Sequence, residues 1–289
     1  MTAARQEPVA ILGIGAMGHG MAASTLRAGI PTVVWNRTPA ATRDLAGRGA
    51  EVAPSAADAA RRAAIVVTMV TDTDAVLSIA HDQGMLAALV PGAIWVQMGT
   101  IGVAGIDRVA ALVQGERPDV TLLDAPVSGS KDPAERGQLT IFASGPQAVR
   151  PLVARLFDAL GQRTIWVGGV GAGSRLKLVN NTLVAFAAEG VASGVALASR
   201  LGLTTEQVLE ALAGSPLVSP WQAAKLARIA KGDYSAQFAL SLALKDVRLA
   251  LQAAEGGFAT LGCLAEEWRQ AADQGLGNQD LTVVTRTLA

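Results

Sequence analysis

Cysteine, histidine and tyrosine are scarce in this chain of 289 residues, which has one cysteine, two histidines and one tyrosine. The single Cys263 excludes an internal disulfide framework and a Cys-based metal site, and such cysteine usage is typical of a reducing compartment. With only His19 and His81 available, a His-based metal site is not expected either. We therefore predict a cytoplasmic protein without a resident metal ion.

A net charge is also lacking, because 24 basic residues balance 24 acidic ones. Without a global field, nothing favours binding to nucleic acid or to an anionic membrane, so a small molecule held by local contacts is the expected partner. The N-terminus has a short apolar run but no cleavage site, and we expect no secretory signal. The most apolar stretch, residues 182–198, is interrupted by Glu189 and falls short of a membrane span.

Hydrophobic residues make up 51% of the chain and charged residues only 17%, which is ample for a large core. From residue 9 to about 167, short apolar runs alternate with Ala-rich helical segments, the pattern of a doubly wound parallel sheet covered on both faces. The expected strands are 9–13, 31–36, 63–70, 93–98, 120–126, 139–145 and 164–169. After residue 171 only helical patterns follow, at about 173–201, from Thr204 or Thr205, and at 221–230, 239–255 and 261–274.

The first expected strand leads into GIGAMGHG, which places Gly13, Gly15 and Gly18 in the spacing G-x-G-x-x-G before a helix. In that context glycine allows a tight turn, and the helix N-terminus offers free N–H groups to a pyrophosphate. The alternative is a Gly-rich turn without a ligand. We predict a Rossmann-type dinucleotide-binding domain over 1–167, with Ala16 and Met17 also at the cofactor, followed by an all-α domain over 168–289.

The second expected strand ends in VVWNRT, where an NAD-selective site usually carries a carboxylate for the ribose hydroxyls. Here the position holds Asn36, followed by Arg37 and Thr38. A guanidinium matches a phosphate, and no carboxylate repels it, so the sequence favours NADP(H) over NAD(H). An ordinary exposed arginine after a strand is the alternative.

Two further loops follow strands of the same expected sheet, and ligands bind at the carboxyl ends of such strands. We expect Met69, Val70 and Thr71 to run along the cofactor. Thr100, in the sequence QMGTIG, offers a hydroxyl to cofactor or substrate.

The sequence DAPVSGS places Ser128 and Gly129 after another expected strand. A turn of small residues, hydroxyls and backbone N–H groups can hold a carboxylate. Taken alone, it would more often be a surface turn.

The segment GAGSRLKLVNN combines helical spacing with three polar residues, Lys177, Asn180 and Asn181, at i, i+3 and i+4. On a helix these side chains project from one face. The alternative to a functional patch is a solvated lysine beside a polar turn.

Four motifs, GIGAMG, DAPVSGS, GAGSRLKLVNN and FALSLALKDVRLA, occur in the order and approximate spacing of the β-hydroxyacid dehydrogenase family. In WNRT, PVSGSKDPAERGQL and KDVRLAL the chain most resembles the NADPH-dependent glyoxylate/succinic semialdehyde reductases of that family. The resemblance implies homodimers or homotetramers through the helical domain. It also implies a catalytic lysine at Lys177, substrate contacts from Asn181, a carboxylate site at Ser128, Gly129 and Thr100, and Lys245 near the cofactor.

The chain departs from the family at two places. The usual acidic-x-Ser-Thr segment reads Gln-Met-Gly-Thr at 97–100, so a hydroxyl is missing at Gly99, and Ser241, Leu242 and Leu244 are smaller or more apolar than in those reductases. A less polar pocket could admit bulkier carbonyls, or imines as in the related imine reductases. Those enzymes usually lack lysine at the position of Lys177.

The expected chemistry is reduction of a small aldehyde or keto acid of the glyoxylate or succinic semialdehyde type. An ammonium stabilises alkoxide character on the substrate oxygen and supplies the proton, which is the role we expect for Lys177, with Asn180 and Asn181 orienting it. Three alternatives stay open: a 3-hydroxyisobutyrate-type dehydrogenase working in the oxidative direction, an imine reductase or reductive aminase, and a non-catalytic NADP-binding sensor or interaction module.

Overall fold

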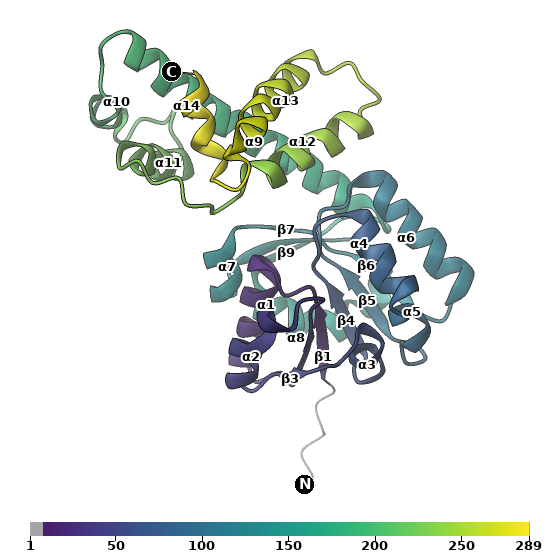
Figure 1. Cartoon of the computed structure of the whole chain (residues 1–289). Coiled ribbons are helices and arrows are strands. Elements are labelled where there is room, and N and C mark those ends of the chain that lie inside the picture. The colour runs from purple at the N-terminus through teal and green to yellow at the C-terminus, as the bar shows by residue number, and fades with distance from the viewer. Residues whose placement is uncertain (1–7, 289) are drawn as a thin grey trace. The chain divides into compact units, whose positions relative to one another are not determined.

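The structure is a computed structural model that describes residues 8–288 (Figure 1). The chain divides into two compact units, Met1–Lys177 and Leu178–Ala289. The division falls inside helix α9 (Ala172–Arg200), later than the boundary at residue 167 expected from the sequence. The reason is local, because the first turn of α9 is hydrogen-bonded to residues of the first unit.

A six-stranded parallel sheet with the order β3-β2-β1-β4-β5-β6 forms the centre of the first unit. Every residue of β1 and β2 is buried, which explains why these strands read as continuous apolar runs rather than as alternating ones. The strand order reverses between β1 and β4, and such a switch point is where open sheets of this type bind ligands. The strands are β1 (Val9–Leu12), β2 (Thr32–Trp35), β3 (Glu51–Val52), β4 (Ile65–Thr68), β5 (Ile94–Gln97) and β6 (Thr121–Asp124).

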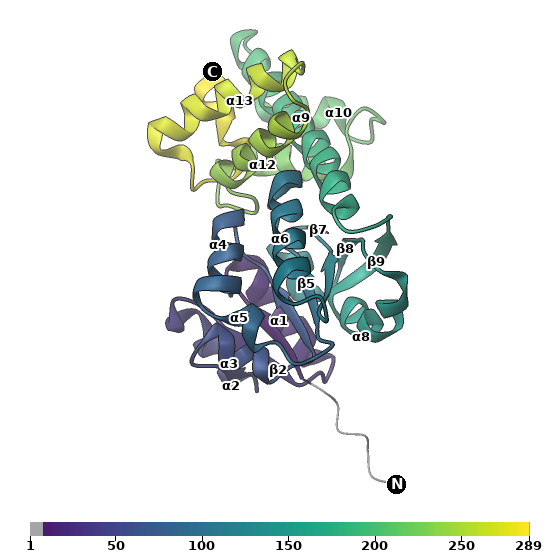
Figure 2. The same cartoon turned by 90° about the vertical axis from the view of Figure 1, so that its right-hand side faces the viewer.

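A second sheet, β7-β8-β9, departs from the single parallel sheet that the sequence suggests (Figure 2). Its strands are β7 (Val127–Ser128), β8 (Leu139–Ala143) and β9 (Gly161–Trp166), and β7 pairs with β8 in the antiparallel direction. The chain reverses at Gly129, which has a φ of +134°, and returns through the short α7 (Lys131–Arg136). That connection is too short for a parallel crossover, so β7 is antiparallel to β8. β8 and β9 pair in parallel as expected, but they lie in a separate sheet, and the prediction that they extend the first sheet was wrong.

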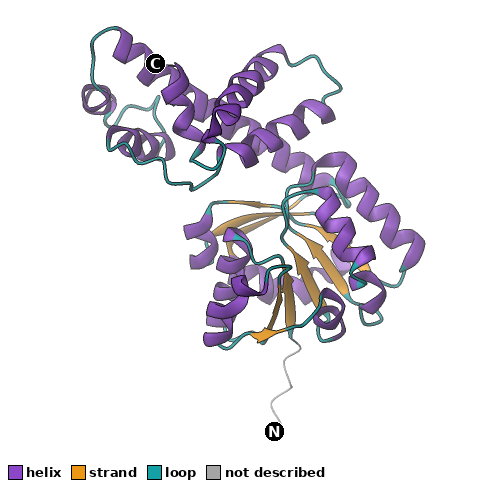
Figure 3. Ribbon diagram, in the orientation of Figure 1, coloured by secondary structure: helices purple, strands orange, loops and turns teal. Residues whose placement is uncertain are grey.

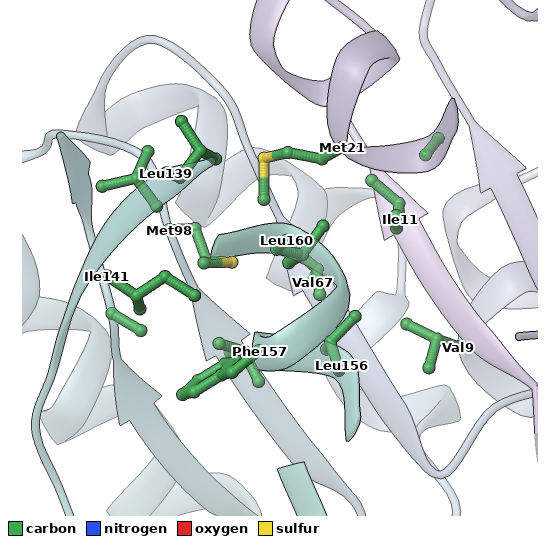
Figure 4. Packing of buried hydrophobic residues seen from close by; sticks show 14 of the residues in the cluster. Val9, Ile11, Met21, Val67, Met98, Leu139, Ile141, Leu156, Phe157 and Leu160 are labelled. Atoms are coloured by element: carbon green, nitrogen blue, oxygen red, sulfur yellow. The ribbon is translucent and has the colours of Figure 1, made fainter. Parts of the chain in front are cut away.

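The first unit carries one apolar core on each face of its six-stranded sheet, because successive strand residues point to opposite faces. Figure 4 shows one of them, where Phe157 of α8 lies among Leu156, Leu160 and strand residues such as Val67. The other core is covered by α3, α5 and α6. The helices are α1 (Ala16–Arg27), α2 (Arg43–Gly47), α3 (Ala56–Arg61), α4 (Thr73–Leu77), α5 (Met85–Ala88), α6 (Gly102–Glu116) and α8 (Arg150–Leu160).

The second unit is built of helices, whereas the named strands, orange in Figure 3, all belong to the first unit. Thr204 caps α10 in a capping box with Gln207, at the position that the sequence predicts for the start of this helix. Ala185, Ala188 and Ala192 of α9 pack into this unit's core. After α9 the helices are α10 (Thr205–Leu212), α11 (Pro220–Ala230), α12 (Leu240–Ala253), α13 (Ala259–Ala271) and α14 (Thr285–Leu288).

Helix α9 is long and apolar enough to cross a membrane if only its length and composition are considered. The core helix of a globular protein satisfies the same criterion, and α9 has the contacts of one. Besides its buried alanines, its Glu189 accepts a hydrogen bond from the indole N–H of Trp268 at 2.8 Å.

Candidate active site

Two of the glycines where β1 leads into α1, Gly13 and Gly18, are required by close contacts, and Gly15 is not. Gly13 has a φ of +97°, and a Cβ there would lie 2.4 Å from the carbonyl oxygen of Met69. A Cβ on Gly18 would lie 1.9 Å from the carbonyl oxygen of Gly13, whereas one on Gly15 would meet nothing within 4 Å. The turn therefore packs closely against other backbone atoms at Gly13 and Gly18. At Gly15 the space beside the N-terminus of α1 is open, and no side chain caps the helix. This arrangement fits a pyrophosphate at the helix N-terminus.

A cavity in the first unit begins at this turn and runs along the ends of β1, β2 and β4. Of the residues expected at the cofactor, it is lined by Gly13, Gly15, Asn36, Arg37, Thr38, Met69, Val70 and Thr71. Ala16, Met17, Gly18 and Thr100 are not among its lining residues, and Lys245 belongs to the second unit. The sequence reasoning missed Trp35, Ala75, Ser78, Ile79 and Gln83.

The missed lining residues carry a weak sequence signal. Ala75, Ser78 and Ile79 follow the loop at Met69 with helical spacing, so one face of that helical segment could have been assigned to the cavity. No motif marked Gln83, which enters from the end of the same segment.

Asn36 connects two loops of this cavity. Its Oδ1 accepts a hydrogen bond from the backbone N–H of Ile14 at 2.9 Å, and its Nδ2 donates to the carbonyl oxygen of Thr38 at 3.0 Å. A carboxylate could accept the first bond but could not donate the second. The amide therefore shapes the loop that holds Arg37 exposed at the cavity wall.

The missing hydroxyl at residue 99 has a steric cause. Gln97 is fully buried and bonds both sides of Gly99, accepting from its N–H at 2.9 Å and donating to its carbonyl oxygen at 2.7 Å. A Cβ on Gly99 would lie 2.3 Å from the carbonyl oxygen of Val70. This close contact brings the segment before Thr100 against the cofactor loop, and Thr100 itself is half-buried.

Ser128 ends β7 instead of lying in a free turn, and it is half-buried. Gly129 follows it and is exposed, and a Cβ there would lie 2.7 Å from Cδ2 of Leu139. The left-handed φ and this contact both demand glycine. Ser128 is thus fixed by strand pairing to Thr140, and a carboxylate site at this turn stays a prediction.

The polar face of α9 is buried. Lys177 is 8% exposed and Asn181 is 5% exposed. These fractions contradict the alternative of a solvated surface lysine, because lysine is rarely buried without a partner or a role.

Asn181 is held by a carboxylate that sequence reasoning did not assign to it. Its Nδ2 donates to Oδ2 of Asp246 on α12 at 2.5 Å, and its Oδ1 accepts from Nδ2 of Asn180 at 3.0 Å. The ammonium of Lys245 lies 2.8 Å from the other oxygen of Asp246. The adjacent Lys245 and Asp246 suggest such a pair, but nothing in the sequence connects α12 to Asn181.

Comparison with known proteins covers both halves of the chain. Residues 8–168 match a family model described as the NAD binding domain of 6-phosphogluconate dehydrogenase, and residues 171–288 match one described as NAD-binding of NADP-dependent 3-hydroxyisobutyrate dehydrogenase. The chain is 31% identical over 280 residues to glyoxylate/succinic semialdehyde reductase 1 of Arabidopsis thaliana, with 96% of each chain covered. It is 32% identical over 289 residues to NAD-dependent L-serine dehydrogenase of Pseudomonas aeruginosa, again with 96% of each covered.

Among solved structures, 3-hydroxyisobutyrate dehydrogenase from Salmonella typhimurium superposes with a TM-score of 0.87 at 27% identity, covering 97% of this chain and 99% of that one. The glycine turn, the cavity beside it and the two matched halves agree with this likeness. The chain therefore belongs to the β-hydroxyacid dehydrogenase family, among its 3-hydroxyisobutyrate dehydrogenase-like members, and is an NAD(P)-dependent oxidoreductase.

Proposed function

We propose that this protein is an NADPH-dependent reductase of small aldehydes or keto acids that carry a carboxylate, of the glyoxylate or succinic semialdehyde type. The observation that carries the proposal is the buried Lys177 on the polar face of α9, within one helical turn of Asn181. A buried ammonium has a large desolvation cost, which a catalytic role explains.

The cofactor site is assigned to residues of the first unit. The turn from Gly13 to Gly18 would hold the pyrophosphate, Arg37 the 2′-phosphate, and the loop at Met69 the remainder of the dinucleotide. When bound, NADPH supplies the hydride and so carries the redox chemistry. The relatives do not decide between NADP and NAD, since one of them is by name NAD-dependent, and the preference for NADPH rests on Arg37.

Lys177 acts on the substrate oxygen. As the carbonyl is reduced, negative charge develops on that oxygen, and the ammonium Nζ stabilises it and then gives it a proton. Asn181, fixed by Asp246, offers its amide to the substrate. Ser128, the N–H groups around Gly129 and the hydroxyl of Thr100 hold the substrate carboxylate.

The alternatives make different demands on the same residues. An enzyme working in the oxidative direction would use Lys177 as the base instead of the acid. An imine reductase would not need the carboxylate site at Ser128. A non-catalytic NADP-binding module would need no acid at Lys177, and its burial argues against that alternative.

One assay separates the carboxylated-aldehyde reductase from the imine reductase and from the non-catalytic module. NADPH oxidation is measured with glyoxylate, succinic semialdehyde, uncharged aldehydes of matched size, and cyclic imines. We expect kcat/KM for the two carboxylated aldehydes to exceed that for the uncharged ones by at least about 10-fold, the value of one charge-assisted contact. In Ser128→Ala this preference should shrink while the rate with uncharged aldehydes is kept. Equal rates irrespective of the carboxylate, faster turnover of imines, or no NADPH oxidation at all would each contradict the proposal.

A further inference from the structure

Asp124, the last residue of β6, places a buried carboxylate against the first turn of α9. Its Oδ2 accepts the backbone N–H of Ser174 at 2.8 Å, and its Oδ1 accepts the hydroxyl of the same serine at 2.8 Å. The hydroxyl of Ser144, which follows β8, also donates to Oδ2 at 3.2 Å. Asp124 is fully buried and takes no part in the mechanism above.

Ser144 completes the attachment of the helix. The backbone N–H of Gly173 donates to its Oγ at 2.9 Å. The first N–H groups of a helix lack intrahelical partners, and side chains from the ends of two strands satisfy two of them here. The first turn of α9 is thus held by both sheets of the first unit.

Gly173 shows how closely the helix approaches the strands. A Cβ there would lie 2.3 Å from the carbonyl oxygen of Phe142 and 2.9 Å from that of Asp124. Both neighbours are backbone atoms, so a larger residue must displace the helix rather than a flexible side chain. Close backbone contact and hydrogen bonds therefore fix the same turn independently.

The hydrogen bonds of Asp124, rather than its charge, form the anchor of this turn. Burial raises the pKa of Asp124, and its bonds to Ser174 and Ser144 act in the opposite direction. A neutral side chain could satisfy the same serines without burying a charge.

Lys177 follows Ser174 by three residues on the same helix, so both lie on one face with Cβ atoms about 5–6 Å apart. A displacement of the first turn is carried directly to the lysine, because the helix is continuous between them. We propose that Asp124 is a positioning residue for Lys177, which sets the place of the ammonium by anchoring the first turn of α9 through Ser174. This inference rests on the proposed role of Lys177.

Two unrelated substitutions should displace the same turn. Asp124→Ala removes the anchor, and Gly173→Ala adds a methyl group against two carbonyl oxygens. We expect each to lower kcat about 10- to 100-fold, the scale for a misplaced catalytic group, with NADPH affinity within about two-fold of wild type. Asp124→Asn should recover most of kcat, because its amide oxygen accepts the N–H of Ser174 and its amide nitrogen donates to the serine hydroxyl.

Leu122→Ala is the matched control for lost stability. Leu122 lies two residues before Asp124 on the same strand and is buried in the apolar core that includes residues of α6, and no hydrogen bond of its side chain anchors α9. It should lower the melting temperature while kcat stays within about two-fold. A fall in kcat with Leu122→Ala equal to that with Asp124→Ala would make the effect structural and overturn the inference.

The deciding experiment combines the variants with Lys177→Ala. A residue that acts through Lys177 has no further effect once the lysine is gone, so Asp124→Ala/Lys177→Ala should react at the rate of Lys177→Ala. If the double variant is slower than Lys177→Ala by the same factor by which Asp124→Ala is slower than wild type, the inference is wrong while the proposed function stands. If Lys177→Ala alone reacts nearly as fast as wild type, the proposed function itself fails. Should Asp124→Ala not fold, Ser174→Ala, which removes only the hydroxyl bond, serves in the same cycle.

Discussion

Arg37 lines the cofactor cavity beside Asn36, whose amide is bonded to Ile14 and Thr38. The WNRT motif was therefore informative only in part. The absence of a carboxylate was visible in the sequence, but the reason for an amide was not, because hydrogen bonds between loops 22 residues apart leave no local pattern.

We predict that Arg37→Ala weakens NADPH binding about 10- to 100-fold and NADH binding by less than about three-fold, because only NADPH carries the phosphate. Fluorescence titration of both cofactors checks this. Arg61→Ala, which removes an exposed charge on α3 outside the cavity, is the control and should leave both affinities unchanged. Equal weakening of NADPH and NADH by Arg37→Ala would remove Arg37 from the phosphate site.

For Gly99 and Asp246, too, the decisive contact joins residues that are distant in sequence and so leaves no local pattern. The missing hydroxyl at 99 was visible, yet its cause is a carbonyl oxygen of Val70 on another loop. The contact of Asp246 with Asn181 joins residues 65 positions apart. Local motifs identify which residues matter, whereas partners distant in sequence emerge only with the fold.

At the scale of elements, long periodic segments were predicted well and short ones were not. The runs that became β1, β2, β4, β5 and β6 are continuous and apolar, and α10 begins at its capping box, so local sequence and structure agree. β7 has two residues and β3 has two, which is too short for any periodicity. The antiparallel pairing of β7 with β8 follows from the reversal at Gly129, where the sequence predicted a ligand-binding turn or a surface turn but no strand reversal.

A buried ion pair joins α11 to the segment before α14. The ammonium of Lys225 lies 2.8 Å from both oxygens of Asp280, which also accepts the backbone N–H groups of Gln237 and Phe238. Burial opposes ionisation of Asp280, but the hydrogen bonds and the attraction of Lys225 outweigh it and hold the pKa of Asp280 below its ordinary 3.8. The ionisation of Asp280 thus stabilises the folded state above pH about 4, and this contribution is lost as pH falls through the lowered pKa. Burial lowers the pKa of Lys225, so the carboxylate and not the ammonium carries this pH dependence.

We predict that Asp280→Asn lowers the free energy of unfolding by about 3–5 kcal/mol at pH 7, because it leaves a buried ammonium without its counter-charge. Urea unfolding at pH 7 and at pH 3 measures this. The variant should lose less stability than wild type between the two pH values, since it lacks the titrating carboxyl. Asp74→Asn, at a carboxylate that is 91% exposed in the first unit, is the control and should change stability far less. If the free energy of unfolding depended on pH identically in wild type and in Asp280→Asn, the lowered pKa of Asp280 would be contradicted.

At the scale of the whole molecule, the sequence predicted a dinucleotide-binding α/β part followed by a helical part, and the fold and family agree with it. What it could not settle is the assembly. Exposed leucines lie on α9 and directly after it in the second unit. Leu183 and Leu197 on the helix are 66% and 58% exposed, and Leu201 just beyond its end is 68% exposed. We propose that this face is covered by a second copy of the chain, as the family resemblance implies.

Light scattering coupled to size exclusion tests the assembly. We expect a dimer or tetramer for wild type and a shift toward monomer for Leu183→Glu/Leu197→Glu, because charges placed in an apolar interface are desolvated without partners. Leu152→Glu alters a leucine on α8 that is 64% exposed, and it should leave the mass unchanged. A monomeric wild type, or no change in mass with the double variant, would contradict an interface on α9.

The central claim is that Lys177 protonates the substrate oxygen, and single-turnover reduction tests it most directly. With NADPH and glyoxylate or succinic semialdehyde both saturating, Lys177→Ala should react about 10²- to 10⁴-fold more slowly than wild type while binding NADPH almost normally. Lys177→Arg should not restore the rate, since a guanidinium gives up its proton far less readily. A Lys177→Ala enzyme that reacts within a few-fold of wild type would contradict the account.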